Sequence, residues 1–125
     1  MTVKALEVER LEKSFGGVKA VGGISFSVEK GQTVGVIGPN GAGKTTVFNL
    51  ITGFYRPDGG RITSFGKNIT RLPPYKLPLL GIARTFQNLR LFGDLTVFEN
   101  VLSAVLRRDG YNVLSGVFRT ADYFV

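Results

Sequence analysis

The sequence predicts an α/β domain in which a glycine-rich loop joins an apolar strand to a helix. Three observations carry this prediction. Two early segments alternate polar with apolar residues, the run Thr33–Ile37 is almost wholly apolar, and glycines at 38, 41 and 43 precede a helical pattern. Alternation is typical of a strand with one wet face, whereas a short apolar run is typical of a strand buried on both faces.

The first elements follow from this alternation. Residues 5–11 place Leu6, Val8 and Leu11 at apolar positions between acidic and basic ones, and residues 24–28 alternate strictly. Each segment predicts a strand. Residues 29–32 predict a turn into the apolar strand 33–37.

The later elements begin with a helix over residues 44–52. Its inward face holds Val47, Phe48, Leu50 and Ile51, and Gly53 stands in the usual C′ position. Residues 57–60 predict a turn into a strand over 61–64, followed by a reversal at 65–68.

The last third of the chain predicts less regular structure. Prolines at 73, 74 and 78 indicate a surface loop or a short helix, and residues 82–86 are a candidate strand. Thr96 and Glu99 form a capping-box pattern that predicts a helix over 97–107. No linker-like stretch divides the chain, so residues 1–125 form one predicted domain.

Composition narrows the possible chemistry. The 125 residues are 43% hydrophobic and 20% charged, as in a globular protein. The absence of Cys excludes disulfides and thiolate metal sites, and the absence of His removes the commonest general base. No apolar run approaches the roughly 18 residues of a membrane span, and the acidic start is unlike a secretory signal. We therefore expect a cytosolic domain.

The net charge of +7 could indicate nucleic acid, an anionic membrane or phosphorylated ligands as partners. The 16 Lys and Arg residues are scattered, however, and only Arg107 and Arg108 are adjacent. An ordinary solvated surface is favoured over a nucleic-acid-binding stripe. No nucleic-acid partner is expected.

The clearest chemical signal is the segment Gly38–Thr45, which matches the P-loop pattern of Gly, four residues, Gly, Lys and Ser or Thr. Glycines let successive N–H groups approach phosphate oxygens, and the following helix directs its positive end at the same anion. A chance match remains the alternative, but the strand before and the helix after favour nucleotide binding. The expected nucleotide contacts are Gly38, Asn40, Gly41, Ala42, Gly43, Lys44, Thr45 and Thr46.

Individual roles follow from side-chain chemistry. Lys44 brings a positive charge to the β- and γ-phosphates, and the Thr45 hydroxyl can coordinate Mg²⁺. The N–H and hydroxyl groups of Thr46 can reach the α-phosphate. The sequence therefore predicts a nucleoside triphosphate and Mg²⁺ as ligands.

The segment 38–46, read as GPNGAGKTT, resembles the Walker A segment of ABC transporter ATPases. The resemblance covers nearly the whole chain. It implies a partial ABC-type nucleotide-binding domain of the P-loop NTPase class, with ATP and Mg²⁺ as cofactors. The part expected here is the antiparallel β subdomain, together with the start of the parallel core and of the helical subdomain.

Upstream, residues 13–16 resemble the A-loop of that family, whose aromatic ring stacks on adenine. The resemblance assigns this role to Phe15, although Tyr is the family's commoner residue. It also assigns Val21 an apolar contact to the base or ribose. Simple core packing is the alternative for Phe15, but a π-face against a purine is chemically sensible.

Downstream, residues 82–88 resemble the strand that leads into the Q-loop. The resemblance implies that the Gln87 side chain reaches Mg²⁺ and the attacking water. Gln87 and Lys44 are therefore the expected catalytic residues. The segment 84–101 is similar to the LivG type, which serves branched-chain amino acid import. Alternatives are the lipopolysaccharide-export type, a soluble ABC ATPase acting on nucleic acid, a GTPase or kinase, and, last, an interaction module without nucleotide.

Partners and location follow from the same resemblance. Two ATPase subunits would enclose two ATP molecules and drive the permease subunits of the transporter. Such a subunit lies in the cytoplasm, peripheral on the inner face of the plasma membrane.

Several parts of a hydrolytic ABC site are missing from this sequence. The nine acids include no Asp-Glu pair after an apolar strand, and no switch His or LSGGQ-like signature is present. Leu114–Val117 resembles a signature only by coincidence, and residues 113–125 fit a variable insert of the LivG type. We expect a truncated gene or a partial sequence, and ATP binding without turnover. The strand 33–37 would lack parallel neighbours, which predicts an exposed apolar edge, marginal stability and aggregation.

Overall fold

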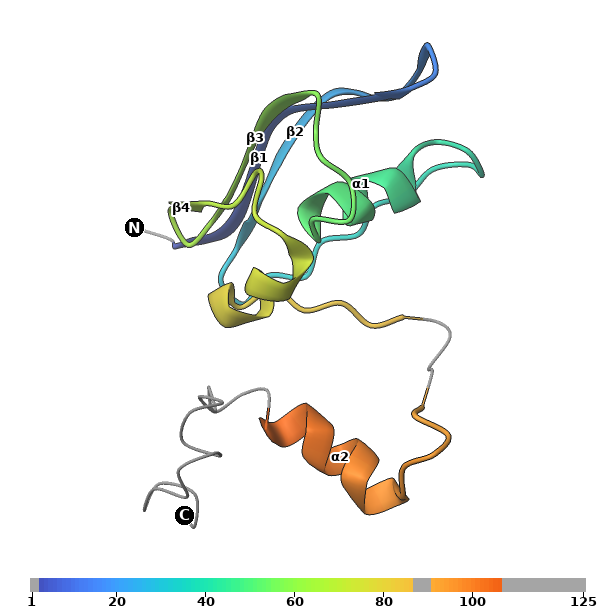
Figure 1. The fold of residues 1–125 in the computed structure, drawn as a ribbon. Helices are drawn as coiled ribbons and strands as arrows, with labels where there is room; N and C mark the ends of the chain where they lie inside the picture. The colour runs from blue at the N-terminus through green and yellow to red at the C-terminus, as the bar shows by residue number, and fades with distance from the viewer. Residues whose placement is uncertain (1–2, 87–90, 107–125) are drawn as a thin grey trace. The chain divides into compact units, whose positions relative to one another are not determined.

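The computed structural model describes residues 3–86 and 91–106 of the chain. The chain divides into two units, residues 1–85 and 86–125, which are described separately. Figure 1 gives the order of the elements.

The first unit contains a four-stranded antiparallel sheet in the order β2-β1-β3-β4. Its strands are β1 (Lys4–Phe15), β2 (Val18–Glu29), β3 (Gly59–Ser64) and β4 (Lys67–Asn68). The two predicted early strands are confirmed, and both extend beyond their predicted bounds. Gly16 and Gly17 join β1 to β2 with φ of 50° and 85°, the positive values that a tight hairpin between twisted strands requires.

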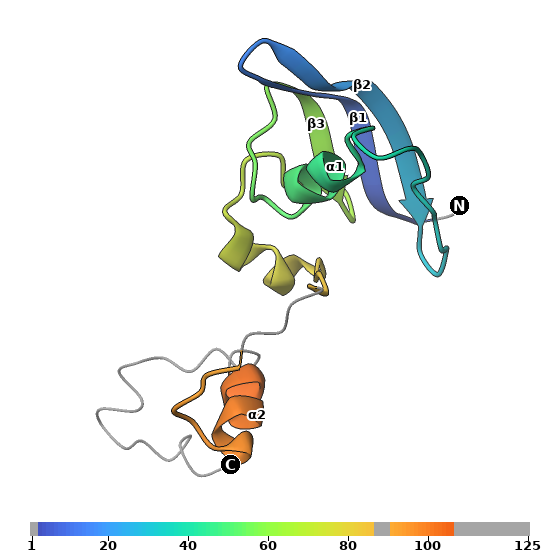
Figure 2. The same ribbon diagram turned by 90° about the vertical axis from the view of Figure 1, so that its right-hand side faces the viewer.

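Helix α1 (Lys44–Ile51) lies across one face of this sheet (Figure 2). The core between them contains eight buried apolar side chains, from Val8, Leu11, Val21, Val47, Leu50, Ile62, Ile69 and Leu77. Gly53 takes the predicted C′ position with φ 73°. The predicted inward face is correct except at Phe48, which is 47% exposed. That residue lies about 100° around the helix from Val47, at the flank of the buried face.

The two candidate strands over residues 33–37 and 82–86 are not formed. Residues 33–37 are described and form no strand, and Ile37 is 95% exposed. A strand requires a neighbouring backbone to accept its hydrogen bonds, and no described residue supplies one here. The predicted exposure of this apolar segment is thus confirmed, whereas its strand conformation is wrong.

Residues 82–86 also form no strand. Their anchor is instead helix α1, because Arg84 Nη1 donates to Asn49 Oδ1 at 2.6 Å. Ile82 N donates to Leu77 O at 3.1 Å, which ties the start of the segment to the turn before it. A side-chain contact with a helix therefore replaces the expected backbone pairing.

The proline-rich connection forms two short 3₁₀ helices, η1 (Pro74–Lys76) and η2 (Pro78–Leu80). The predicted reversal at 65–68 is confirmed, since β3 (Gly59–Ser64) pairs with β4 beyond Phe65 and Gly66. The predicted turn at 57–60 is only partly correct, because β3 begins at Gly59, two residues before the predicted strand. Leu77, between the two 3₁₀ helices, is buried in the core of the unit.

The second unit contains helix α2 (Val97–Leu106), whose start carries the predicted capping box. Thr96 N and Oγ1 each donate to Glu99 Oε2 at 2.8 Å, and Glu99 N donates to Thr96 Oγ1 at 3.2 Å. The Thr96 N–H, followed by its hydroxyl, lowers the pKa of Glu99. Over the described residues, neither helix has the length and apolar character that a membrane crossing requires.

Candidate nucleotide-binding site

The glycine-rich loop ends where helix α1 meets strand β2. Gly43 is the N-cap of α1, with φ 82° and ψ 4°. A Cβ at this position would lie 2.4 Å from the carbonyl oxygen of Ala20 in β2. Only glycine allows this close approach, so the sequence fixes the start of the helix against the sheet.

Lys44 is the first residue of α1, and its side chain folds back over the loop. Its Nζ donates to the carbonyl oxygens of Gly38 and Pro39, each at 2.6 Å. Ala42 N donates to Pro39 O at 3.2 Å and narrows the same loop. These bonds hold the ammonium group beside the loop backbone at the start of the helix.

No side chain in the first turn of α1 offsets the positive partial charge at the amino-terminal end of the helix. Gly43 makes no side-chain cap, and the first turn contains no acidic residue. The first intrahelical bond runs from Val47 N to Gly43 O at 2.9 Å, which leaves the N–H groups of Lys44, Thr45 and Thr46 without intrahelical acceptors. Such a helix start attracts an anion.

The loop and the helix start supply groups of the types that a triphosphate requires. Asn40, Gly41, Ala42 and Thr45 are exposed, and Gly41 has φ 83°. Gly38 faces Ala42 closely, since a Cβ on Gly38 would lie 3.2 Å from the Ala42 Cβ. Within residues 3–86 and 91–106, no group of three or more His, Cys, Asp or Glu residues could hold a metal ion. A hydroxyl such as that of Thr45, with phosphate oxygens, fits Mg²⁺ without such a cluster.

Phe15 and Val21 occupy different environments. Val21 is buried in the core, and its Cγ2 lies 3.7 Å from where a Cβ on Gly43 would stand. Phe15 is 43% exposed at the end of β1 and is therefore not a core residue. Its ring meets that of Tyr55 edge to face, with centroids 5.1 Å apart and planes at 70°.

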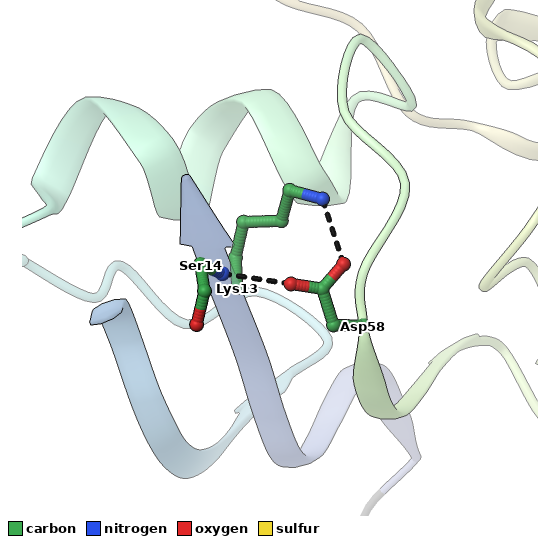
Figure 3. Close-up of polar contacts among 3 residues, drawn as sticks. All are labelled: Lys13, Ser14 and Asp58. Atoms are coloured by element: carbon green, nitrogen blue, oxygen red, sulfur yellow. Dashed lines mark hydrogen bonds and ion pairs between the residues drawn. The ribbon is translucent and has the colours of Figure 1, made fainter. Parts of the chain in front are cut away.

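A carboxylate in the turn before β3 binds the end of β1 (Figure 3). Asp58 accepts from Lys13 Nζ at 2.8 Å through Oδ1 and from Ser14 N at 2.7 Å through Oδ2. Lys13, and then the Ser14 N–H, lower the pKa of Asp58. Sequence reasoning assigned Asp58 only to a turn, because its partners lie more than 40 residues earlier and no local pattern reveals them.

The proposed Q-loop residue Gln87 lies outside the described residues, as do Leu114–Val117 and the insert 113–125. The structure describes the residues that lead toward Gln87 as far as Phe86. Arg84 anchors this approach on α1, where its Nη1 lies 3.4 Å from Thr52 Oγ1 in addition to its bond with Asn49.

A glycine-rich loop that opens a helix and carries a lysine at the helix start defines a P-loop domain. The family model of ABC transporters matches residues 21–122. The chain therefore belongs to the ABC transporter family, and the predicted fold class, a partial ABC-type P-loop domain, is confirmed.

Curated relatives of the LivG type match almost the whole chain. The branched-chain amino acid transport ATP-binding protein BraF of Pseudomonas aeruginosa is 51% identical over 98% of this chain and 48% of its own length. LivG of Salmonella typhimurium is 43% identical over the same shares. The chain thus spans about half the length of the curated relatives it matches.

A solved structure gives the same result for the fold. The ADP conformation of an ATP-binding cassette of an ABC transporter is 41% identical, with a TM-score of 0.75 over 96% of this chain and 47% of that one. The resemblance to ABC transporter ATPases, and within them to the LivG type, is confirmed by these relatives.

Proposed function

We propose that this chain binds ATP and Mg²⁺ through residues 38–46, as part of the ATP-binding subunit of an ABC importer. The observation that carries the proposal is the start of α1, where the Lys44 ammonium lies against the loop carbonyls and the helix end has no acidic residue. Both features favour a polyanion over a neutral ligand.

The residues divide into phosphate, metal and base contacts. The N–H groups of Gly38, Asn40, Gly41 and Gly43 bind phosphate oxygens, together with those of the helix start. The Ala42 N–H also binds a phosphate oxygen, in exchange for its bond with Pro39 O. Lys44 exchanges its carbonyl partners for the β- and γ-phosphates, which are stronger, charged acceptors. Thr46 reaches the α-phosphate.

Thr45 and Gln87 hold Mg²⁺, which neutralises charge on the phosphates when it is bound. Phe15 stacks on adenine, which its exposed position at the end of β1 allows. Val21 keeps its proposed apolar contact to the base or ribose, with a side chain that is 4% exposed beside Gly43. Lys44 and Gln87 are the catalytic residues of this scheme in the complete subunit.

The transported solute is proposed from the relatives. The proteins from Pseudomonas aeruginosa and Salmonella typhimurium are named for branched-chain amino acid transport. The complete protein would then pair with a second ATPase subunit and with membrane permease subunits, on the cytoplasmic face of the plasma membrane. We propose that residues 1–125 alone bind ATP without turnover, because their nine acids provide no Asp-Glu pair after an apolar strand.

The test is equilibrium binding of ATP with Mg²⁺ to the full chain and to Lys44→Ala. Loss of the ammonium should weaken binding by about tenfold to a hundredfold, as expected for a charge-assisted contact of roughly 1.5–3 kcal/mol. Lys19→Ala is the control, because Lys19 is an exposed lysine on β2 that pairs with Glu12 at 3.6 Å. Circular dichroism of each variant checks the fold. Equal affinity of the wild type and Lys44→Ala would mean that the site lies elsewhere.

A second titration separates the nucleotide classes. ATP should bind at least as tightly as GTP, because stacking on Phe15 accepts either purine. A preference for GTP would instead favour another P-loop class, such as a GTPase.

A further inference from the structure

The end of β1 is fastened to the turn between α1 and β3 at three points. Asp58 accepts from Lys13 Nζ and from Ser14 N (Figure 3). Its own N–H donates to Glu12 O at 2.9 Å. Pro57, the residue before it, is buried. The carboxylate therefore stands on a fixed turn and binds the two residues that immediately precede Phe15.

Lys13 transmits this contact to the aromatic ring. Its side chain is only 16% exposed, and its Nζ lies 5.3 Å from the Phe15 ring centroid as well as 2.8 Å from Asp58 Oδ1. The ammonium thus bridges the carboxylate and the ring. A cation at this distance is attracted to the ring face, and a poorly hydrated one depends on its carboxylate partner.

Tyr55, in the segment that follows α1, restricts the orientation of the Phe15 ring from another side. It follows α1 in the chain, and its edge-to-face contact with Phe15 joins the helix side of the unit to the hairpin. The ring orientation is therefore set by Lys13, by Tyr55 and by the backbone at Ser14. Two of these three constraints depend on Asp58.

We infer that Asp58 is a positioning residue for the nucleotide base, acting on Phe15 through Lys13 and Ser14. The inference rests on the proposed function, in which Phe15 stacks on adenine. Stacking is favourable only when the ring is already oriented, because ordering a mobile side chain on binding opposes affinity. Asp58 removes that cost before the base arrives.

The inference predicts a loss that is selective for ligands with a base. Asp58→Asn keeps the size of the side chain but removes the charge that holds Lys13. Binding of ATP should fall about three- to tenfold, because only part of the favourable stacking of the base on the aromatic ring is lost. Binding of inorganic tripolyphosphate, which has no base, should be unchanged.

A double-mutant cycle tests the route through the ring. In the Phe15→Ala background, Asp58→Asn should have no further effect on ATP affinity, because the group that Asp58 positions is gone. Lys13→Met removes the same ion pair from the other side and should reproduce the ATP-selective loss. Lys19→Gln is the control on the hairpin, since the Lys19 side chain pairs with Glu12 Oε1 at 3.6 Å and makes no ion pair with Asp58. It should leave both ligands unaffected.

Each other outcome has a distinct meaning. If Asp58→Asn and Lys13→Met weaken ATP and tripolyphosphate equally, or leave ATP binding unchanged, Asp58 has no positioning role. A loss that persists in the Phe15→Ala background also overturns the inference. If Lys44→Ala binds both ligands as tightly as the wild type does, the proposed function itself fails, and the inference fails with it.

Discussion

The strands of the packed sheet and the segment 33–37 before the glycine-rich loop both carry apolar side chains, but several of those in the sheet are buried in the core, whereas those in the segment are exposed. Leu11 in β1 is fully buried, and Leu50 in α1 and Ile62 in β3 lie beside it in the core. In the segment 33–37, Val36 is 40% exposed and Ile37 is 95% exposed. Both regions belong to the same unit of the chain.

The difference shows that an apolar pattern specifies a strand only when the chain also supplies its neighbours. β1 has β2 on one side and β3 on the other, so its backbone groups are paired and its apolar face meets α1. No described residue pairs with 33–37. An exposed apolar segment of this kind favours association.

The largest expected difference between the two regions is in the free energy of unfolding. Leu50→Ala should lower it by about 2–5 kcal/mol, because the substitution opens a cavity between α1 and the sheet. Ile37→Ala should change it by less than about 0.5 kcal/mol, since an exposed side chain loses little on truncation. Urea unfolding of the full chain followed by circular dichroism measures both values.

Self-association of the chain should depend on the exposed segment 33–37 rather than on the packed sheet. Ile37→Lys should raise the concentration at which the chain scatters light, because a charge interrupts the exposed apolar segment 33–37. Equal destabilisation by Leu50→Ala and Ile37→Ala would contradict the comparison. A wild-type chain that melts cooperatively as a monomer at high concentration would contradict the predicted marginal stability.

A smaller difference in unfolding free energy, between two glycine positions, concerns backbone contacts inside the sheet. A Cβ on Gly60 would lie 2.4 Å from Arg10 O and 2.5 Å from Glu9 O, and φ at Gly60 is 89°. Gly66 has a similar φ of 78°, with nothing within 4 Å of a Cβ. Gly66→Ala should cost about 1–2 kcal/mol from backbone strain. Gly60→Ala should cost about 1–3 kcal/mol more, because β3 must move away from β1.

Urea unfolding of the two alanine variants, compared with the wild type, gives both costs. Gly66→Ala serves as the control for strain without a clash. Equal costs would mean that the approach of β1 to β3 at Gly60 is not tight in solution.

The smallest effect is the pH dependence of the Asp58 contact. The pKa of Asp58 is lowered from its ordinary value of 3.8, so the carboxylate form is favoured in the folded chain. The resulting stability is fully present above the unfolded pKa and is lost as the pH falls through the lower folded pKa. The difference in unfolding free energy between the wild type and Asp58→Asn should be constant above about pH 5 and shrink below about pH 4.

Urea unfolding at a series of pH values gives this difference directly. Taking it between the two proteins cancels the titration of the other acids. A difference that grows as the pH falls would contradict the contact. Lys19→Gln, which breaks an exposed pair, should give a nearly flat profile.

Local chemistry explains which parts of the fold were predictable. The alternation in β1 and β2, the Gly53 helix end and the Thr96 capping box are signals within a few residues, and the structure contains each of them. The prediction that Phe48 faces inward was wrong, because this residue lies at the flank of the buried face of α1. The strands predicted over residues 33–37 and 82–86 were wrong, because strand formation depends on distant partners rather than on the segment itself.

The candidate site divides in the same way. The glycine-rich loop and Lys44 could be found because phosphate binding requires particular residues at fixed spacing in one segment. Asp58 could not be found, since its role depends on contacts with Lys13 and Ser14 across 45 and 44 residues. The role of Gln87 remains a prediction, because that residue lies outside the described part of the chain.

Amide hydrogen exchange of the full chain, with and without ATP and Mg²⁺, tests the central claim most directly. We expect slow exchange in β1, fast exchange over residues 33–37, and added protection over residues 38–46 when the nucleotide is present. The added protection should disappear in Lys44→Ala. If the nucleotide leaves exchange at residues 38–46 unchanged in the wild type, the loop does not bind it and the account is wrong.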